Sequence, residues 1–193
     1  MPAAALRTAY FILVGLVGLE RLFELWLSTR NRRRALALGA VEVGERHYLW
    51  MVALHTAFLF ACVGEVWVLQ RPFVPVLAIV MLALLVLSMA LRYWAIATLG
   101  ERWNTRVVVL PEAPAIAGGP YRFVRHPNYI AVVVEMLALP LVHAAWITAL
   151  AGSVLNVWLL SIRIRVEEDA LRRHCSYETQ LAGRGRWVPG STP

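Results

Sequence analysis

Long apolar runs separated by short, arginine-rich segments make up most of this chain. Three runs, residues 5–27, 48–69 and 73–99, are each long enough to cross the hydrocarbon core of a bilayer, which takes about 20 apolar residues in a helix. Each run is therefore predicted to be one membrane-spanning helix. The first run continues directly into charged positions without a small-residue cleavage site, so we expect it to be a retained anchor.

A fourth apolar run, residues 129–162, is too long for a single crossing. Its 34 residues would extend about 50 Å as one helix, at about 1.5 Å per residue. Pro140 and His143 lie near its middle, and a proline removes a backbone donor and clashes with the preceding turn. We therefore predict a tight helical hairpin with its bend at residues 139–146, and about five membrane-spanning helices in all.

Composition supports a membrane protein and excludes several other classes. Of the 193 residues 60% are apolar, and the mean hydropathy is strongly positive, outside the range of soluble domains. The net charge is +7, but no nucleic-acid-binding motif accompanies it. Cys62 and Cys175 form neither a disulfide framework nor a metal motif. The predicted fold is all-α and polytopic, a single domain over residues 1–193 with a cytoplasmic helical tail at its C-terminal end.

The arginines are divided unequally between the two sides of the predicted spans. Fifteen belong to residues 30–46, residues 102–125 and the segment from Arg163 onward, whereas only Arg7 and Arg71 lie on the other side. Basic residues near span ends are retained in the cytoplasm. We therefore expect the N-terminus outside, and the polar segments and the tail together in the cytoplasm.

The most unusual polar segment, residues 118–130, overlaps the start of the fourth apolar run. A proline at position 127 holds the backbone extended at His126 and suits the first position of a helix. Asn128 and Tyr129 add polar atoms at this helix start. From the residues alone, the segment fits a ligand site and an ordinary capped span with an interfacial tyrosine equally well.

A second polar segment continues the last span. Arg163 and Glu167 are four residues apart, so they lie on one face of a helix. Their spacing alone favours a simple helix exit, with arginines near the lipid headgroups and acids in water. A functional role requires that the two polar segments meet.

Taken together, the two segments resemble those of a known family. The run GPYRFVRHPNY at residues 119–129, the apolar hairpin, and then RIRVEEDAL at residues 163–171 closely resemble the isoprenylcysteine carboxyl methyltransferases, which are integral membrane enzymes. The resemblance covers about residues 91–189. It implies S-adenosylmethionine bound in a cytosol-facing pocket between the two segments, and a lipophilic acceptor that enters from the bilayer.

The resemblance also assigns roles to individual residues. The implied cofactor-binding residues are Ile116, Tyr121, His126, Pro127, Asn128, Tyr129 and Glu167. Arg163 matches a substrate-anchoring arginine and is the implied catalytic residue, and no metal ion is expected. A carboxylate can engage the amino group or the ribose hydroxyls of the cofactor, and an arginine can hold an anionic oxygen. Methyl transfer is an in-line displacement, so positioning and exclusion of water are expected to dominate.

Two departures from the prenylcysteine enzymes bear on the acceptor. The tail is shorter before Tyr177, and Gln180 and Leu181 stand where a second tyrosine is expected. The first half is more similar to a bacterial branch associated with type III polyketide synthases, which methylates long-chain alkylpyrones and alkylresorcinols on oxygen. The residues that carry this similarity are Glu20, Arg21, Glu24, Arg30, Asn31, residues 39–48 and His55. We therefore expect a hydroxyl acceptor of this class in a bacterial inner membrane. The expected partners are this lipophilic substrate and membrane lipid, with no nucleic acid and no obligate protein partner.

Polar residues within the predicted spans require partners, because an unpaired charge in a bilayer costs at least about 2.5 kcal/mol. We interpret Glu20, Arg21 and Glu24 as marking the cytoplasmic end of the first span. Arg92 is expected to neutralise a carboxylate, and Glu135 lies near the cytoplasmic end of its helix.

A resorcinol acceptor would need a general base, whereas a hydroxypyrone is largely ionised at neutral pH. His47, His55 and Glu65 are the candidates for this base, and the residues alone do not separate them. His55 is also a candidate substrate-binding residue, with a hydrogen bond between helices as the alternative.

Two other functional classes fit parts of the chain. Sterol-reductase-like membrane proteins carry a similar Arg-His-x-Asn-Tyr element but bind NADPH. Pro127, the small number of spans and the Glu167-Glu168 pair favour the methyl donor instead. A non-enzymatic scaffold or small transporter has no specific motif to support it.

Overall fold

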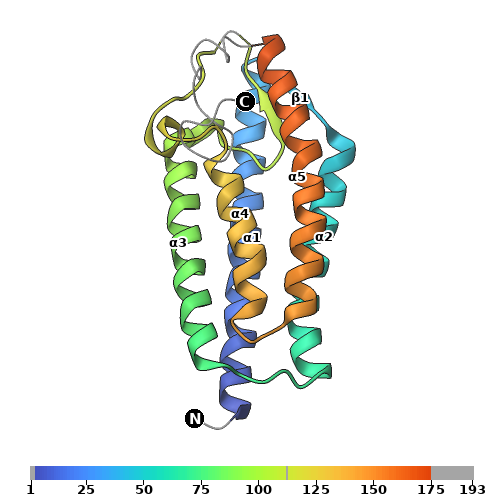
Figure 1. The fold of residues 1–193 in the computed structure, drawn as a ribbon. Helices are drawn as coiled ribbons and strands as arrows, with labels where there is room; N and C mark the ends of the chain where they lie inside the picture. The colour runs from blue at the N-terminus through green and yellow to red at the C-terminus, as the bar shows by residue number, and fades with distance from the viewer. Residues whose placement is uncertain (1–2, 112, 175–193) are drawn as a thin grey trace.

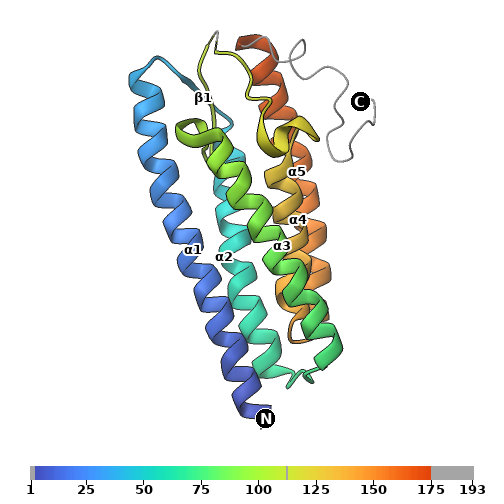
Figure 2. The ribbon, with the colours of Figure 1, turned by 90° about the vertical axis from the view of Figure 1, so that its left-hand side faces the viewer.

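The structure is a computed structural model, and it describes residues 3–111 and 113–174. These residues form five α-helices that run side by side along one axis and alternate in direction (Figures 1 and 2). The helices are α1 (Ala3–Ala37), α2 (Glu45–Val68), α3 (Pro75–Leu99), α4 (Pro127–Leu141) and α5 (Trp146–His174). The prediction of a mainly helical fold is confirmed. The tail beyond residue 174, with Tyr177, Gln180 and Leu181, lies outside the described residues.

Four of the five helices, α1, α2, α3 and α5, are long and apolar enough to cross a membrane. The fifth, α4, is apolar but has only 15 residues. At about 1.5 Å per residue it extends about 22 Å, which is shorter than a hydrocarbon core of about 30 Å. Ala131, Ala138 and Leu139 of α4 are completely buried against the other helices. The described residues thus have four candidate spans and one shorter buried helix, where we predicted about five spans.

The hairpin formed by α4 and α5 agrees with the prediction. The turn between Leu141 and Trp146 lies inside the predicted bend, and Pro140 lies in the last turn of α4. Glu65 of α2 caps the N-terminus of α5 after this turn. Its carboxylate accepts hydrogen bonds from the backbone N–H groups of Ile147 (3.2 Å) and Thr148 (2.6 Å). A carboxylate at a helix N-terminus stabilises the unpaired N–H groups there.

Two short strands correct the all-helical prediction. β1 (Val41–Val43) pairs with β2 (Val107–Val109) in an antiparallel arrangement, with Val41 opposite Val109. The pair joins the α1–α2 connection to the α3–α4 connection. Val107 and Val109 are buried against Ala170 of α5, which explains why a valine-rich segment outside the spans becomes ordered. A run of only three residues has no periodicity strong enough to predict.

The strands and the polar connections gather at one end of the bundle, opposite the N-terminus (Figures 1 and 2). This end also contains the 3₁₀ turns η1 (Gly100–Arg102) and η2 (Gly119–Arg122). Gly119 adopts a positive φ of 53°, and a Cβ atom there would lie 2.2 Å from the hydroxyl of Thr98. Only glycine allows this turn to pack directly on the end of α3. The turn delivers the polar segment to the start of α4.

Candidate active site

The first turn of α4 places several of the predicted site residues. Pro127 occupies the first helical position, as predicted, whereas His126, with φ −128° and ψ 59°, lies outside the fully extended region that we predicted. The backbone N–H groups of Tyr129 and Ile130 then donate to the His126 carbonyl, at 3.1 and 3.3 Å. Tyr129 is only 7% exposed, so it is not an interfacial anchor. This helix start turns its polar side chains into the protein.

The Tyr129 hydroxyl connects the two polar segments. Arg163 Nε donates to this hydroxyl at 2.7 Å, and the hydroxyl donates to a carboxylate oxygen of Glu167. Arg163 is only 6% exposed, and its Nη1 lies 3.6 Å from the sulfur of Met51 on α2. The interpretation of residues 163–167 as a simple helix exit is therefore wrong. Helix α5 continues to His174, and this face of it turns inward.

Glu168 is a buried partner that the sequence reasoning missed. Its carboxylate accepts a hydrogen bond from His126 Nε2 at 3.1 Å, and the residue is 1% exposed. The His126 ring also stacks on the Tyr129 ring, with centroids 5.3 Å apart and planes 20° from parallel. A signal was present, because Glu168 continues the row of Leu160 and Ile164 at four-residue spacing, and both are buried.

A cavity of about 410 Å³ lies at the polar end of the bundle, and we call it the loop-end cavity. Its volume is within the usual range for small-molecule sites, about 300–1,000 Å³. Six of the seven predicted cofactor residues line it, together with Arg163: Ile116, Tyr121, His126, Asn128, Tyr129 and Glu167. Pro127 is the exception, because it is buried at the start of α4 and contributes by fixing that helix start.

Two polar atoms in this cavity wall have no hydrogen-bond partner among the described residues. They are Oδ1 of Asn128, an acceptor, and Nε1 of Trp103, a donor. A buried polar atom without a partner is costly, so both atoms are suited to a polar ligand. Trp103 is 3% exposed, in contrast to Trp94 and Tyr93 of α3, which are 46% and 44% exposed.

A second cavity, of about 480 Å³, lies deeper in the bundle, and we call it the helix cavity. Its wall is mainly apolar, with Gly15, Gly18 and Leu22 from α1 and Leu59 and Phe60 from α2. Leu22 and Phe60 are 62% and 75% exposed on the outer surface. The helix cavity therefore reaches the side of the bundle between α1 and α2, where the lipid tails of a bilayer would lie.

The two cavities share part of their walls. Trp103, Asn104, Asn128, Tyr129 and Arg163 line both of them. Arg163 and the Tyr129 hydroxyl are therefore accessible from a polar compartment on one side and an apolar compartment on the other. Such an arrangement can bring a polar ligand and a lipophilic ligand together at one place.

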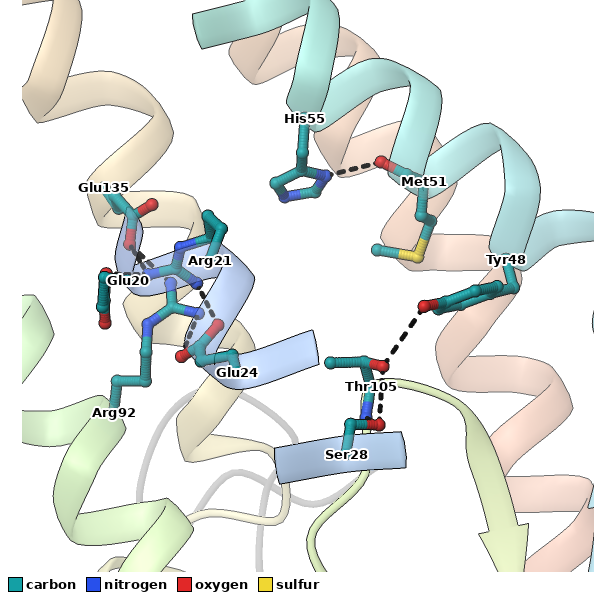
Figure 3. A network of polar contacts seen from close by, with 10 residues as sticks. All are labelled: Glu20, Arg21, Glu24, Ser28, Tyr48, Met51, His55, Arg92, Thr105 and Glu135. Carbon is teal, nitrogen blue, oxygen red and sulfur yellow. Dashed lines mark hydrogen bonds and ion pairs between the residues drawn. The ribbon is translucent and has the colours of Figure 1, made fainter. Parts of the chain in front are cut away.

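An ion cluster borders the helix cavity, and we define it as Glu20, Arg21, Glu24, Arg92 and Glu135 (Figure 3). Arg21 contacts Glu20 and Glu24 at 2.6 Å each and Glu135 at 3.1 Å, while Arg92 contacts Glu135 at 2.6 Å. Arg92 also lies 3.5 Å from Glu24. The predicted pairing of Arg92 with a carboxylate is confirmed.

The ion cluster also corrects the interpretation of the first span. Helix α1 continues to Ala37, so Glu20, Arg21 and Glu24 lie well inside it and do not mark its end. Glu24 is 4% exposed and packs toward α3 and α4. The apolar run in the sequence stops before the helix does, because the last turns of α1 carry the arginines.

The three candidate bases occupy different environments. His55 lines the helix cavity, and its Nδ1 lies 2.8 Å from the carbonyl oxygen of Met51 in the same helix. The alternative, a hydrogen bond from His55 to another helix, is not found among the described residues. His47 lines neither cavity and lies against Gly44. Glu65 is held at the opposite end of the bundle by the start of α5 and by Arg71, at 2.8 Å. Of these three described residues, His55 alone lines a cavity, whereas His47 lies outside both cavities but within electrostatic range of Arg163 and Glu167.

Ionisable groups outside the spans form contacts at the polar end of the bundle. Burial raises the pKa of Glu42 in β1, but hydrogen bonds from Arg32 (2.5 Å) and Arg106 (2.9 Å) outweigh this and leave its pKa below the usual value. Burial, assisted by the nearby Glu167, raises the pKa of Tyr121. Tyr121 therefore lines the loop-end cavity as a neutral phenol.

Comparison with known proteins identifies the family. A sequence model of the isoprenylcysteine carboxyl methyltransferase family matches residues 80–173. The uncharacterized protein YpbQ of Bacillus subtilis is 33% identical over 166 residues, which cover 86% of this chain and 98% of that protein. An uncharacterized protein of Haemophilus influenzae is 32% identical over 152 residues, which cover 78% of this chain and 88% of that protein.

The chain belongs to the isoprenylcysteine carboxyl methyltransferase family. Membership implies an integral membrane methyltransferase that uses S-adenosylmethionine, and it does not favour the reductase alternative. The matched region contains every predicted cofactor residue, Arg163 and the Arg92–Glu135 pair. The residues of α1 and α2 that border the helix cavity lie before it. In this isoprenylcysteine carboxyl methyltransferase family member, the matched region thus contains nearly all the residues that line the loop-end cavity. Most of those that line the helix cavity come from α1 and α2 instead.

Proposed function

We propose that the protein transfers a methyl group from S-adenosylmethionine to an oxygen of a lipophilic acceptor, namely the hydroxyl of a long-chain alkylresorcinol or alkylpyrone. The observation that carries this proposal is the wall that the two cavities share. Arg163 and Tyr129 stand between a polar cavity suited to the donor and an apolar cavity suited to the acceptor.

The chemistry of the loop-end cavity fits the proposed donor. S-adenosylmethionine supplies an electrophilic methyl group on a positively charged sulfur. Tyr121 offers an aromatic ring to a cation, and Glu167 offers a negative charge. The unpartnered Oδ1 of Asn128 can accept from an amino or hydroxyl group, and Nε1 of Trp103 can donate to a carboxylate. We propose that Ile116, His126 and Pro127 complete the pocket by shape and by positioning the start of α4.

In this mechanism Arg163 orients the acceptor. Its guanidinium stays charged in the protein, so it can hold a developing or existing anionic oxygen at the shared wall. The Nε bond to Tyr129 and the nearby Met51 sulfur fix the side chain in one position. Because Arg163 and Tyr129 are only 6% and 7% exposed, a donor and an acceptor in the two cavities would exclude most water from them. Catalysis then rests on orientation rather than on a covalent intermediate.

The helix cavity supports an acceptor with a long alkyl chain. Its exposed edge between α1 and α2 would let such a chain remain in the bilayer while the polar head reaches Arg163. The alternative acceptor is an isoprenylcysteine-like carboxylate, which has a lipid tail as well and which Arg163 could also hold. The partners proposed for the protein are therefore a lipophilic substrate and the surrounding membrane lipid.

We further propose that the loop-end cavity faces the cytoplasm of a bacterial cell, with the N-terminus outside the inner membrane. The described part of the arginine-rich segments lies at the polar end of the bundle, and Arg7 lies in the first turns of α1 at the other end (Figures 1 and 2). This distribution follows the tendency of basic residues to remain in the cytoplasm.

The test is methyl transfer by the detergent-purified protein, with radiolabelled S-adenosylmethionine and three acceptors supplied separately. These are pentadecylresorcinol, a long-chain alkyl hydroxypyrone and N-acetyl-S-farnesylcysteine. The proposal expects label in at least one of the first two. Label in the farnesylcysteine alone would replace the hydroxyl acceptor with the carboxyl acceptor, and label in none of the three would contradict the proposal. The Arg163→Ala variant is expected to lose most activity with the hydroxypyrone, whose oxygen is already anionic.

A further inference from the structure

His55 is a histidine in the wall of the helix cavity with one nitrogen still available. Its Nδ1 lies 2.8 Å from the carbonyl oxygen of Met51, and a carbonyl oxygen can only accept a hydrogen bond. Nδ1 therefore carries the hydrogen, and in the neutral ring Nε2 keeps its lone pair. No hydrogen bond joins Nε2 to any described residue. The backbone thus holds the ring in the tautomer that can accept a proton at Nε2.

The surroundings of His55 connect it to the proposed site of transfer. Met51, which fixes the ring through its carbonyl, also places its sulfur 3.6 Å from Arg163 Nη1. His55 and Arg163 line the same cavity. Figure 3 shows the His55 ring on the side of α2 that faces the ion cluster, and His55 lines the helix cavity together with Arg21, Glu24 and Arg92 of that cluster. A head group held by Arg163 would therefore enter the compartment that Nε2 faces.

Glu135 of the ion cluster can stabilise a positive charge on this ring, whereas Arg21 and Arg92 oppose it. The cluster contains three carboxylates and two guanidinium groups, so its formal charge is −1 when all are ionised. A new charge in a low-dielectric pocket is costly unless an opposite charge lies near it. The ring lies within electrostatic range of Glu135, Arg21 and Arg92. Protonation of His55 would offset the charge of the ion cluster, and the positive charge of Arg163 in the same cavity would be balanced by the anionic acceptor oxygen.

We propose that His55 is the general base of the reaction and that Nε2 removes the proton of a neutral acceptor hydroxyl. This inference rests on the proposed function. As the O–H bond breaks, its proton passes to Nε2, and the oxygen forms a bond to the methyl carbon. The electron pair of the carbon–sulfur bond remains on sulfur, so the products are a methyl ether, S-adenosylhomocysteine and protonated His55. The proton later leaves to water, which restores the ring.

Other groups near the site are less suited to this role. Arg163 stays protonated, and the Tyr129 hydroxyl is engaged by both Arg163 and Glu167. His126 already contacts Glu168 through Nε2. Each carboxylate of the ion cluster contacts at least one arginine. Among the described histidines that line the two cavities, Nε2 of His55 is the one basic ring nitrogen without such a contact.

The inference predicts a dependence on the acidity of the acceptor. A resorcinol hydroxyl is a phenol, which loses its proton only near pH 10 in water. A hydroxypyrone is already ionised at neutral pH and requires no base. General acid–base catalysis contributes roughly 100- to 10,000-fold in rate. His55→Gln should therefore lower kcat for pentadecylresorcinol by at least about 100-fold and change kcat for the hydroxypyrone little.

The experiment measures kcat and KM for both acceptors in the wild type, His55→Gln, His55→Ala and a control, His143→Gln. His143 is buried, and its two ring nitrogens have no hydrogen-bond partner among the described residues, but it lies in the α4–α5 turn at the other end of the bundle. Unchanged S-adenosylmethionine affinity in each variant verifies folding. Added imidazole should restore resorcinol methylation in His55→Ala, because it can replace the missing base.

The results separate this inference from the proposed function. A loss of methylation of the resorcinol alone, restored by added imidazole, supports the role of His55 as the general base. An equal loss with both acceptors, no loss with either, or a wild type that methylates only the hydroxypyrone would overturn the role of His55 and leave the methyltransferase intact. A wild type that methylates neither acceptor would overturn the proposed hydroxyl-methylating function, and the inference with it.

Discussion

At the scale of single residues, the Tyr129 hydroxyl is the centre of the proposed site. It has one hydrogen to donate, which goes to Glu167, and it accepts from Arg163 with a lone pair. The phenol thus links a carboxylate that faces the loop-end cavity to a guanidinium that faces both cavities. The residues assigned to donor and acceptor are directly connected, so a change in one is expected to affect the other through Tyr129.

The Glu167→Gln variant tests the donor side of this connection. It removes a negative charge but keeps the size of the side chain. A hydrogen bond to a charged group contributes about 1.5–3 kcal/mol, so we expect S-adenosylmethionine to bind about 10- to 100-fold more weakly, with a smaller effect on acceptor KM. Isothermal titration calorimetry measures the affinity.

Asp169→Asn is the matched control for Glu167→Gln. Asp169 lies on the same helix but has a 57% exposed side chain paired with Arg172. Its affinity for S-adenosylmethionine should equal that of the wild type, because exposed ion pairs contribute little. Equal affinities in Glu167→Gln and the wild type would remove Glu167 from the donor site.

At the scale of elements, the β1–β2 pair ties together the connections at the polar end. Glu42 of β1 receives hydrogen bonds from Arg32 at the end of α1 and from Arg106 beside β2. Arg106 also lies over the ring of Tyr48 of α2, 4.0 Å from its centroid. One carboxylate thus links three elements around the loop-end cavity.

The lowered pKa of Glu42 predicts how stability depends on pH. Because its pKa in the folded protein lies below the usual 4.5, the ionised carboxylate stabilises the fold above that value. This contribution is lost as the pH falls below about 4.5 and through the lower, folded pKa. The Tm difference between the wild type and Glu42→Gln in detergent should therefore be positive at pH 7 and shrink as the pH falls toward 3.

Glu101→Gln provides the comparison, because Glu101 also pairs with an arginine of α1 but its side chain is 67% exposed. Its Tm should be close to that of the wild type throughout. If the Tm difference for Glu42→Gln is the same at pH 7 and pH 3, the linkage argument is wrong.

At the scale of the whole molecule, the gap between α1 and α2 is the proposed acceptor path. Gly15 of α1 lines the helix cavity there, and a Cβ atom at this position would meet no atom within 4 Å. The site therefore has room for a side chain without distortion of the helices. A larger residue would occupy the space proposed for the alkyl chain.

Gly15→Leu should accordingly raise KM for a long-chain alkylresorcinol by about tenfold or more, with little change for an unsubstituted resorcinol or in S-adenosylmethionine affinity. A tenfold change corresponds to about 1.4 kcal/mol, which is less than the transfer energy of a few buried methylene groups. The control is Gly64→Leu, at an equally open position on α2 that does not line the cavity. An equal KM in Gly15→Leu and Gly64→Leu would exclude this path.

The sequence predicted the helices well because membrane spans depend on hydropathy over about 20 residues. Residues 139–146 were predicted as the bend of the hairpin, and α4 and α5 are joined within that range. The β1–β2 pair was missed because three-residue strands form only through tertiary contact, here with Ala170. The apolar run at residues 5–27 also ended ten residues before α1 does.

Most residues of the candidate site were predicted from the resemblance of their motifs to a known family. The structure adds the contacts between these residues, which motifs do not show. The convergence of His126, Tyr129 and Glu167 on one cavity was predicted from the family resemblance. Their contacts with the cofactor stay a prediction. The ion cluster was misread, because hydropathy does not reveal that α1 faces α3 and α4 at Glu24. The contact of Glu168 with His126 was not predicted, because the two residues are 42 positions apart in the sequence.

The most direct test of the account is the binding of S-adenosylmethionine and of NADPH to the detergent-purified wild-type protein, measured by calorimetry. The account predicts saturable binding of S-adenosylmethionine and no binding of NADPH. Binding of NADPH alone would contradict it in favour of a reductase. Binding of neither ligand, in protein that unfolds cooperatively on heating, would contradict the assignment of the loop-end cavity to the methyl donor.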